Sequence, residues 1–207
     1  MQVAVTGHTA GLGKAIAERL VRDGHELLGF SLENGYDVST PEGITRIVTE
    51  AADCDLFVNC AHDRRNHGIG QVGILTNLFY QWQNEEKHII NIGSNAPDNY
   101  SREMVPGASR YRASKMALDA AVLEINQLWK PCRVSIVRPN WMDGEASRRF
   151  EEHAKVKLPK LTCEEVADIV AMIARMGSSI TIQSITLSRT IHRPEAPAKR
   201  RGWWRRR

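Results

Sequence analysis

Short apolar runs alternate with segments of helical period along most of this chain. Six runs rich in branched and aromatic residues have the length and composition of buried strands. The longer segments repeat their apolar positions every three to four residues, as helices with one buried face do. We therefore predict strands at 2–6, 26–30, 55–59, 88–92, 133–137 and 180–187, and helices at 11–22, 41–52, 71–83, 108–128 and after Thr162.

The regular alternation of strand and helix predicts an α/β fold. Strands that alternate with helices form a parallel sheet covered on both faces, and right-handed crossovers leave the doubly wound, Rossmann-like sheet as the default topology. We expect one such domain over residues 1–190, followed by a separate basic tail at 191–207. A sheet of this kind places its ligand crevice at the carboxyl ends of the strands.

Charge is distributed unevenly between this domain and the tail. The 207 residues carry a net charge of +4, but eight of the 28 basic residues and one of the 24 acidic residues lie from Arg189 onward. The body is therefore −3 and the tail +7, so the positive total gives no reason to class the body as a nucleic-acid binder. The tail contains Trp203 and Trp204 and is predicted to be flexible; contact with nucleic acid, a membrane or a partner subunit stays open for it.

The spacing of the cysteines and the sequence of the N-terminus indicate in which cellular compartment the protein is expected. Cys54, Cys60, Cys132 and Cys163 form no C-x-x-C pair and no cluster with histidine, so we expect reduced thiols and no metal site. The chain enters an apolar run directly from Met1, and no apolar stretch approaches the ~20 residues of a membrane-spanning helix. These features predict a cytoplasmic protein.

Glycines lie at the junction of the first strand and first helix, within the segment Thr6-Gly7-His8-Thr9-Ala10-Gly11-Leu12-Gly13. Glycine lets the backbone turn sharply and lets phosphate oxygens approach N–H groups at a helix N-terminus. A glycine pattern alone is a weak signal, but this position is the one that dinucleotide binding requires.

Three further segments carry residues suited to acid–base chemistry. Tyr111 and Lys115 are spaced i, i+4 near the start of a long helix, so they share one helical face, and a neighbouring cation would lower the pKa of the phenol. Ser94 follows the strand at 88–92 and so belongs at the edge with the ligand crevice. Asn59 ends another strand, with the small residues Cys60 and Ala61 behind it.

Taken in order, these segments resemble the short-chain dehydrogenase/reductase family. TGHTAGLG is similar to its T-G-x-x-x-G-x-G, YRASK to its Y-x-x-x-K, and Asn59-Cys60-Ala61 stands where the family has N-N-A or N-A-G. Asn91-Ile92-Gly93-Ser94, Asp37-Val38 and Arg138-Pro139-Asn140 match three further family segments. The likeness extends over residues 1–187, and the ordered set is far more specific than any one motif.

The resemblance implies a role for each matching residue. Tyr111 would be the catalytic acid or base, Lys115 would bind the nicotinamide ribose and lower the tyrosine pKa, and Ser94 would orient the substrate oxygen. The remaining residues would contact the cofactor: Gly7, His8, Thr9, Gly11, Leu12 and Gly13 at the pyrophosphate, Ser31, Asp37 and Val38 on the adenosine side, and Asn59, Cys60, Ala61 and Pro139 near the nicotinamide half.

The chain departs from the family pattern in several places. The segment between Ala61 and Gln71 is short, so the fourth catalytic residue, a helical asparagine, is either Asn66, which we favour, or Asn77. Asn140 replaces a glycine, and asparagine tolerates the positive φ of such a turn. The segment at 141–158, which forms the substrate lid in the family, is short and highly charged. His62 and His67 are interpreted as solvated loop residues, and Trp82 as part of the core or an interface.

The sequence thus predicts an oxidoreductase that moves hydride between a nicotinamide cofactor and a small carbonyl or alcohol. Ser31 stands where an acidic residue would select NAD, which favours NADP over NAD. We expect a homo-oligomer, because the helices at 71–83 and 108–128 are those that the family pairs. The alternative functions are a non-catalytic dinucleotide sensor and an adaptor that acts through the basic tail.

Overall fold

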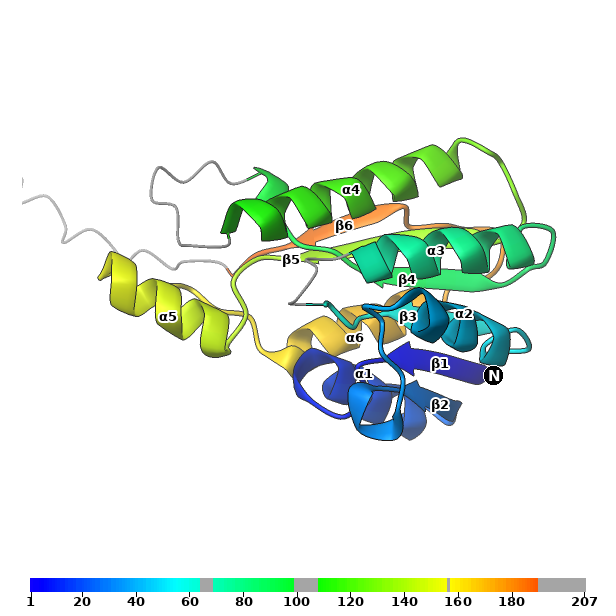
Figure 1. Cartoon of the computed structure of the whole chain (residues 1–207), viewed down its shortest axis with the longest axis horizontal. Coiled ribbons are helices and arrows are strands. Elements are labelled where there is room, and N and C mark those ends of the chain that lie inside the picture. Colours follow the sequence, from blue (N-terminus) through cyan, green and yellow to red (C-terminus); the bar gives the residue numbers. More distant parts are fainter. Residues whose placement is uncertain (64–68, 99–107, 156, 190–207) are drawn as a thin grey trace, which may run out of the picture.

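Six parallel strands form one sheet in the computed structural model, which describes residues 1–63, 69–98, 108–155 and 157–189. The strand order is β2-β1-β3-β4-β5-β6, and each neighbouring pair is parallel. This is the predicted doubly wound α/β fold (Figure 1). The strands are β1 (Gln2–Thr6), β2 (Glu26–Phe30), β3 (Leu56–Asn59), β4 (His88–Ile92), β5 (Arg133–Pro139) and β6 (Ser184–Leu187).

The order of the strands reverses at β1, which pairs with β2 on one side and β3 on the other. The chain moves outward from β1 to β2 and then returns across β1 to build the rest of the sheet. A crevice for a ligand opens at the carboxyl ends of the strands where the order reverses. The predicted glycine turn follows β1, and Asn59 ends β3, so both lie at this point.

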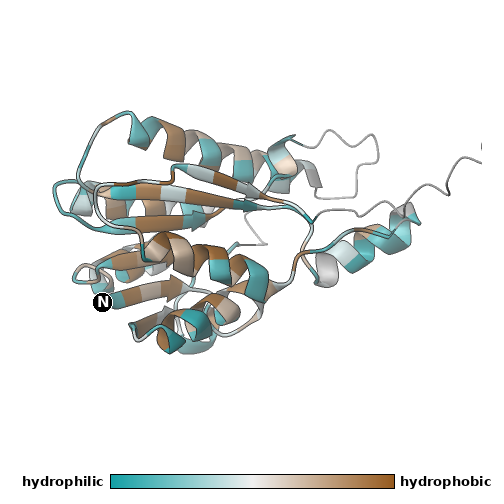
Figure 2. Cartoon of the chain, turned by 180° about the vertical axis from the view of Figure 1, so that it is seen from behind, coloured by the Kyte–Doolittle hydropathy of each residue, from teal (hydrophilic) through white to brown (hydrophobic). Residues whose placement is uncertain are grey.

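Helices cover both faces of the sheet (Figures 1 and 2). Ile16 and Leu20 of α1 and Val166 and Val170 of α6 share one apolar core with β1, β3 and β4, whereas α2, α3 and α4 pack in a second core on the opposite face. Trp82 is fully buried in that second core. The helices are α1 (Gly11–Arg22), α2 (Pro41–Glu50), α3 (Ile69–Trp82), α4 (Ala108–Asn126), α5 (Glu145–Ala154) and α6 (Cys163–Ala174), with short 3-10 turns η1 (Leu32–Asn34) and η2 (Ala96–Asp98).

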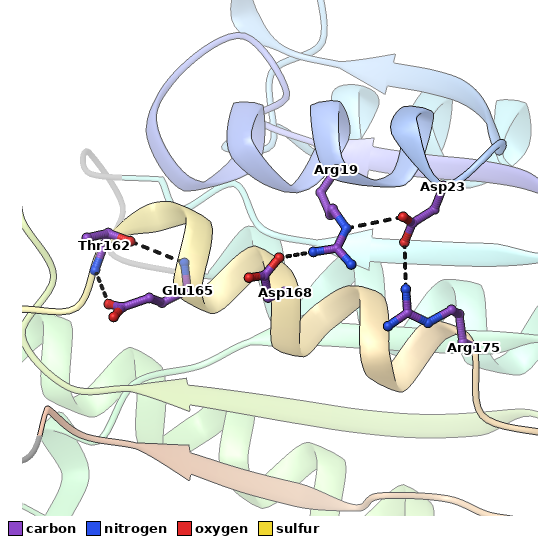
Figure 3. Close-up of polar contacts among 6 residues, drawn as sticks. All are labelled: Arg19, Asp23, Thr162, Glu165, Asp168 and Arg175. Atoms are coloured by element: carbon purple, nitrogen blue, oxygen red, sulfur yellow. Dashed lines mark hydrogen bonds and ion pairs between the residues drawn. The ribbon is translucent and has the colours of Figure 1, made fainter.

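Ion pairs join α1 to α6 along their shared side (Figure 3). Arg19 contacts Asp168 across the two helices and also Asp23, the residue that follows α1, at 3.2 Å; Asp23 in turn accepts from Arg175 at 3.0 Å. The N-terminus of α6 has the predicted capping box, in which Thr162 Oγ1 accepts from the Glu165 N–H and Glu165 accepts from the Thr162 N–H. The last large helix is therefore fixed at its start and along its length.

Most predicted elements are present with bounds shifted by only a few residues, and one helix was missed. α2 ends at Glu50, α4 ends at Asn126, and β6 begins only at Ser184. The segment expected as a charged lid contains α5, whose Phe150 ring packs against Trp141 with centroids 4.6 Å apart. Figure 1 shows α5 projecting from the edge where the strands end. In the described part of the chain no helix combines the length and apolarity needed to cross a bilayer.

Candidate active site

The turn after β1 is a tight glycine turn at the start of α1. Gly7 has φ +75°, and a Cβ added to Gly13 would lie 2.1 Å from the Gly7 carbonyl oxygen. A side chain at Gly13 would therefore push the turn away from the helix. The His8 ring lies over Gly29 of β2, where it would meet an added Cβ at 2.4 Å. The turn thus packs closely against both α1 and β2, and glycine is required at position 13.

Thr6 fixes the end of β3 beside this turn. Its buried hydroxyl oxygen accepts hydrogen bonds from the N–H groups of Cys60 and Ala61, each at 2.9 Å. Ala61 contacts the position of Gly7, where an added Cβ would lie 3.4 Å away. The structure therefore brings the predicted Asn59-Cys60-Ala61 segment against the glycine turn.

The residues expected near the adenosine lie in the loop after β2. Ser31 is buried, and both its N–H and its hydroxyl donate to Asn34 Oδ1, at 2.7 and 3.0 Å. The Asp37 carboxylate accepts from the N–H and hydroxyl of Ser39, and a Cβ added to Gly70 would lie 2.1 Å from the Val38 carbonyl. The loop is thus held by its own polar groups, and the hydroxyl of Ser31 is directed into it.

Ser94 is held at the end of β4 by backbone pairing that continues past the strand. The N–H of Gly93 donates to the Val137 carbonyl at 2.8 Å, and that of Asn95 donates to the Pro139 carbonyl at 3.1 Å. Ser94 is buried, its hydroxyl oxygen accepts from the Ala96 N–H at 3.1 Å, and it forms a side-chain hydrogen bond with Tyr111. The predicted serine and tyrosine therefore meet.

Tyr111 lies in the first turn of α4 with His62 beside it. The two rings are perpendicular, with centroids 5.1 Å apart. Burial raises the pKa of Tyr111 above its ordinary value, and the hydrogen bond with Ser94 partly offsets that rise. The interpretation of His62 as a solvated loop residue is wrong, because its ring packs against the candidate acid.

Lys115 lies one helical turn after Tyr111 and is buried, with its Nζ 5.7 Å from the centroid of the tyrosine ring. The ammonium donates to Gln71 Oε1 at 2.7 Å and to the Ile92 carbonyl at 2.9 Å. Burial lowers the pKa of Lys115 to about 8, while Cys60 and Asp119 act in the opposite direction. The lysine is still mostly protonated at neutral pH, but its ammonium is more acidic than that of an exposed lysine.

The expectation that Lys115 lowers the pKa of Tyr111 is not met in this structure. The pKa of Tyr111 is raised, and the groups that act on it are burial and Ser94. The physical reason is that the ammonium points to Gln71 and Ile92 at the strand ends. Lys115 contacts the ring of Tyr111, so the two share a helical face as predicted, but burial outweighs the charge.

Gln71 is the site residue that the sequence analysis missed. It is buried in the first turn of α3 and links the lysine to Asn59. The available signal was a polar residue at the start of an otherwise apolar helix, on the edge where strands end. Of the two asparagines considered for this role, Asn77 is exposed on α3 and so lies outside the site, and Asn66 lies outside the described residues.

The turn after β5 differs from expectation. Asn140 does not have a positive φ; among the described non-glycine residues only Trp129 and Lys155 do. Instead its N–H donates to the Leu187 carbonyl at 2.8 Å, which extends the pairing of β5 with β6. A glycine is not needed there because the backbone stays extended.

The described cavities lie away from these residues. A hollow of about 330 Å³ lies between α4, β5 and the start of β6, and neither Ser94, Tyr111 nor Lys115 lines it. The candidate site is therefore described by its hydrogen bonds and ring contacts. Within the described residues no group of three or more histidine, cysteine or acidic side chains has the arrangement of a metal site.

The fold is that of several solved dehydrogenase structures. An alcohol dehydrogenase from Thermococcus sibiricus, complexed with 5-hydroxy-NADP, is 19% identical with a TM-score of 0.70 and aligns with 95% of this chain and 100% of its own. A 3-alpha-hydroxysteroid dehydrogenase from Pseudomonas sp. B-0831, complexed with NADH, is 22% identical with a TM-score of 0.70 and aligns over 90% and 94%. Serine dehydrogenase from Escherichia coli is 19% identical with a TM-score of 0.66, aligned over 90% and 97%.

Comparison of sequences adds no closer relative. No protein-family model matches the chain, and no curated protein matches it. At identities of 19 to 22% the structural likeness establishes the architecture and leaves the activity to be argued from the site. This chain has the doubly wound fold of dinucleotide-bound dehydrogenases along nearly its whole length.

Proposed function

We propose that this chain is a short-chain dehydrogenase/reductase that interconverts a small carbonyl compound and its alcohol with a nicotinamide dinucleotide. The observation that carries the proposal is the meeting of Ser94, Tyr111 and Lys115 at the carboxyl edge of the sheet. Ser94 follows β4, whereas Tyr111 and Lys115 belong to α4. Tyr111 bonds to Ser94, and hydrogen bonds to Gln71 and Ile92 hold Lys115 one helical turn away. A protein that only sensed a dinucleotide would have no use for a half-buried phenol that is hydrogen-bonded to a serine hydroxyl.

The groups fit a proton transfer to or from the substrate oxygen. When bound, the nicotinamide would supply the hydride that a carbonyl carbon accepts in reduction. Tyr111 donates its proton to the carbonyl oxygen, and the Ser94 hydroxyl donates a hydrogen bond to that same oxygen. The raised pKa of Tyr111 keeps the phenol protonated in the resting site, as a general acid must be. The hydrogen bond with Ser94 favours the phenolate left after transfer, and Lys115, one helical turn away, would bind the ribose of the nicotinamide.

The residues at the switch point of the sheet fit a dinucleotide. Gly7 and Gly13 allow the tight turn that brings β1 directly into the start of α1, and a pyrophosphate binds at the backbone N–H groups of such a helix N-terminus. Asn59, Cys60 and Ala61 lie next to this turn and would border the nicotinamide half. We propose these residues, with the other members of the glycine turn, as the cofactor site.

NADP is the cofactor we propose over NAD. Ser31 directly follows β2, the strand next to the glycine turn, and its hydroxyl donates to Asn34 Oδ1. A carboxylate at this position would accept from a 2′-hydroxyl and repel a 2′-phosphate. Ser31 offers no carboxylate to a 2′-hydroxyl and no negative charge to repel a 2′-phosphate, which supports NADP.

Replacement of Tyr111 by phenylalanine tests the proposed reaction. Tyr111→Phe should keep the affinity for NADPH and lower kcat by about 10²-fold or more, because general acid catalysis contributes about 10²–10⁴-fold. The measurement is loss of NADPH absorbance against a panel of aldehydes and ketones, with NADPH affinity from fluorescence titration. Tyr80→Phe, at an exposed position on α3, is the matched control. Full turnover by Tyr111→Phe would show that this phenol is not the acid.

A further inference from the structure

The side-chain amide of Gln71 lies at the centre of the buried polar network under the candidate site. Its Oε1 accepts from Lys115 Nζ at 2.7 Å, and its Nε2 donates to the carbonyls of Asn59 at 2.9 Å and Ile92 at 3.1 Å. The amide has one acceptor oxygen and two donor protons, and all three functions are used. Its orientation is fixed, because the reverse would set N–H against an ammonium and oxygen against two carbonyls.

The backbone of Gln71 completes a reciprocal pair with Asn59. Asn59 Nδ2 donates to the Gln71 carbonyl at 2.8 Å and to Asn91 Oδ1 at 3.0 Å. The first turn of α3 is thereby joined to the ends of β3 and β4 from both sides. The Ile92 carbonyl accepts from Gln71 and also from Lys115. Both acceptors of the ammonium, Gln71 Oε1 and the Ile92 carbonyl, thus belong to a hydrogen-bonded group whose members cannot rotate freely.

We propose that Gln71 is the positioning residue for Lys115, and that its side-chain amide fixes the ammonium at the ends of β3 and β4 below Tyr111. Only the expected effect on turnover rests on the proposed function; the position of the ammonium does not. The chemistry explains the residue type: a glutamate lacks the two donor protons, and an asparagine is one methylene shorter than this bridge. The titratable groups that act on the ammonium are Cys60 from the β3 side and Asp119 from α4.

A titration of Lys115 tests whether Gln71 positions its ammonium, and it does not require that the enzyme turn over a substrate. Protein carrying lysine labelled with ¹³C at Cε is titrated by NMR, and the Lys115 signal is identified by its loss in Lys115→Met. Removal of a neutral acceptor destabilises the ammonium, so Gln71→Met should move the Lys115 midpoint to lower pH; Gln71→Glu should move it to higher pH. Gln81→Met, at an exposed position on the same helix, should leave it unchanged.

Kinetics add the catalytic consequence. Gln71→Met should lower kcat by about tenfold with little change in the KM for the carbonyl, since a hydrogen bond to a charged group has about that effect. A Lys115 midpoint equal in Gln71→Met and Gln81→Met overturns the inference, whatever the activity. Absence of turnover in the wild-type chain counts against the proposed function only. Should Gln71→Met fail to fold by circular dichroism, an unshifted midpoint in Gln71→Glu overturns the inference instead.

Discussion

At the scale of single residues, the buried ammonium of Lys115 makes stability depend on pH. Burial lowers its pKa to about 8 in the folded chain, from 10.5 in the open chain. Between these values the unfolded state binds more protons than the folded state, so the free energy of unfolding rises with pH there. Below about pH 8 the full cost of burying the charge is present, and above about pH 10.5 it is gone. The contribution of this lysine is a few kcal/mol.

The difference between wild type and Lys115→Met isolates that contribution. The raised pKa of the buried Cys132 thiol acts in the opposite direction above pH 9, but it is the same in both proteins. The thiol of Cys60 interacts with Lys115, so Cys60 is replaced by alanine in both proteins. Urea unfolding at several pH values should show the wild-type free energy increasing relative to that of Lys115→Met from pH 8 to pH 10.5. A constant difference over this range would mean that Lys115 has an ordinary pKa.

The sequence predicted the pairs of site residues that depend on local spacing and missed those that depend on the fold. The i, i+4 spacing placed Tyr111 and Lys115 on one helical face, and the resemblance of YRASK to Y-x-x-x-K gave them their expected roles. Gln71 was missed because its partners come from other elements, 44 residues away for Lys115. His62 was misinterpreted for the same reason, since only tertiary structure sets its ring against Tyr111. The direction of the Tyr111 pKa depended on burial, which spacing alone does not reveal.

At the scale of elements, the capping box of α6 gives a direct test of local encoding. Thr162→Ala removes the hydroxyl that accepts from the Glu165 N–H, leaving one helix N–H without its partner. The loss should lower the free energy of unfolding by about 1 kcal/mol, within the ~0.5–2 kcal/mol of such caps. Chemical denaturation measures it, with Thr162→Ser as the control that keeps the hydroxyl. Equal destabilisation by both variants would place the effect in the threonine methyl group instead.

The bounds of helices and strands were predictable where the segment has an apolar pattern and a local sequence signal, such as a capping box, marks its end. β1, β2 and β4 have the predicted bounds, and α6 begins where its capping box indicated. α5 was missed because its sequence is rich in charge and only Phe150 packs against another ring, that of Trp141. β6 is shorter than its apolar run because pairing with β5 starts at Ser184, opposite Ile136. Pairing, unlike periodicity, is decided by the neighbouring strand.

At the scale of the whole molecule, the order of the strands concentrates the polar chemistry at one edge. Because β1 pairs with both β2 and β3, the glycine turn, the end of β3 and the loop after β2 lie together. β4 then places Ser94 beside them, and α4 contributes Tyr111 and Lys115 to the same edge. Residues separated by more than a hundred positions therefore lie along one edge of the sheet, and a ligand bound along this edge would contact elements from both halves of the sheet.

A ligand that binds only the folded chain stabilises the whole molecule through these contacts. At about 100 times its Kd, NADPH should add about 2.7 kcal/mol, which raises the Tm of a domain of this size by about 5–10 °C. NADH at the same concentration should give a smaller shift, because Ser31 offers no carboxylate to its 2′-hydroxyl. Differential scanning fluorimetry measures both. ADP-ribose with and without a 2′-phosphate should reproduce the difference, since the nicotinamide plays no part in it; equal shifts from all four compounds would contradict the proposed preference.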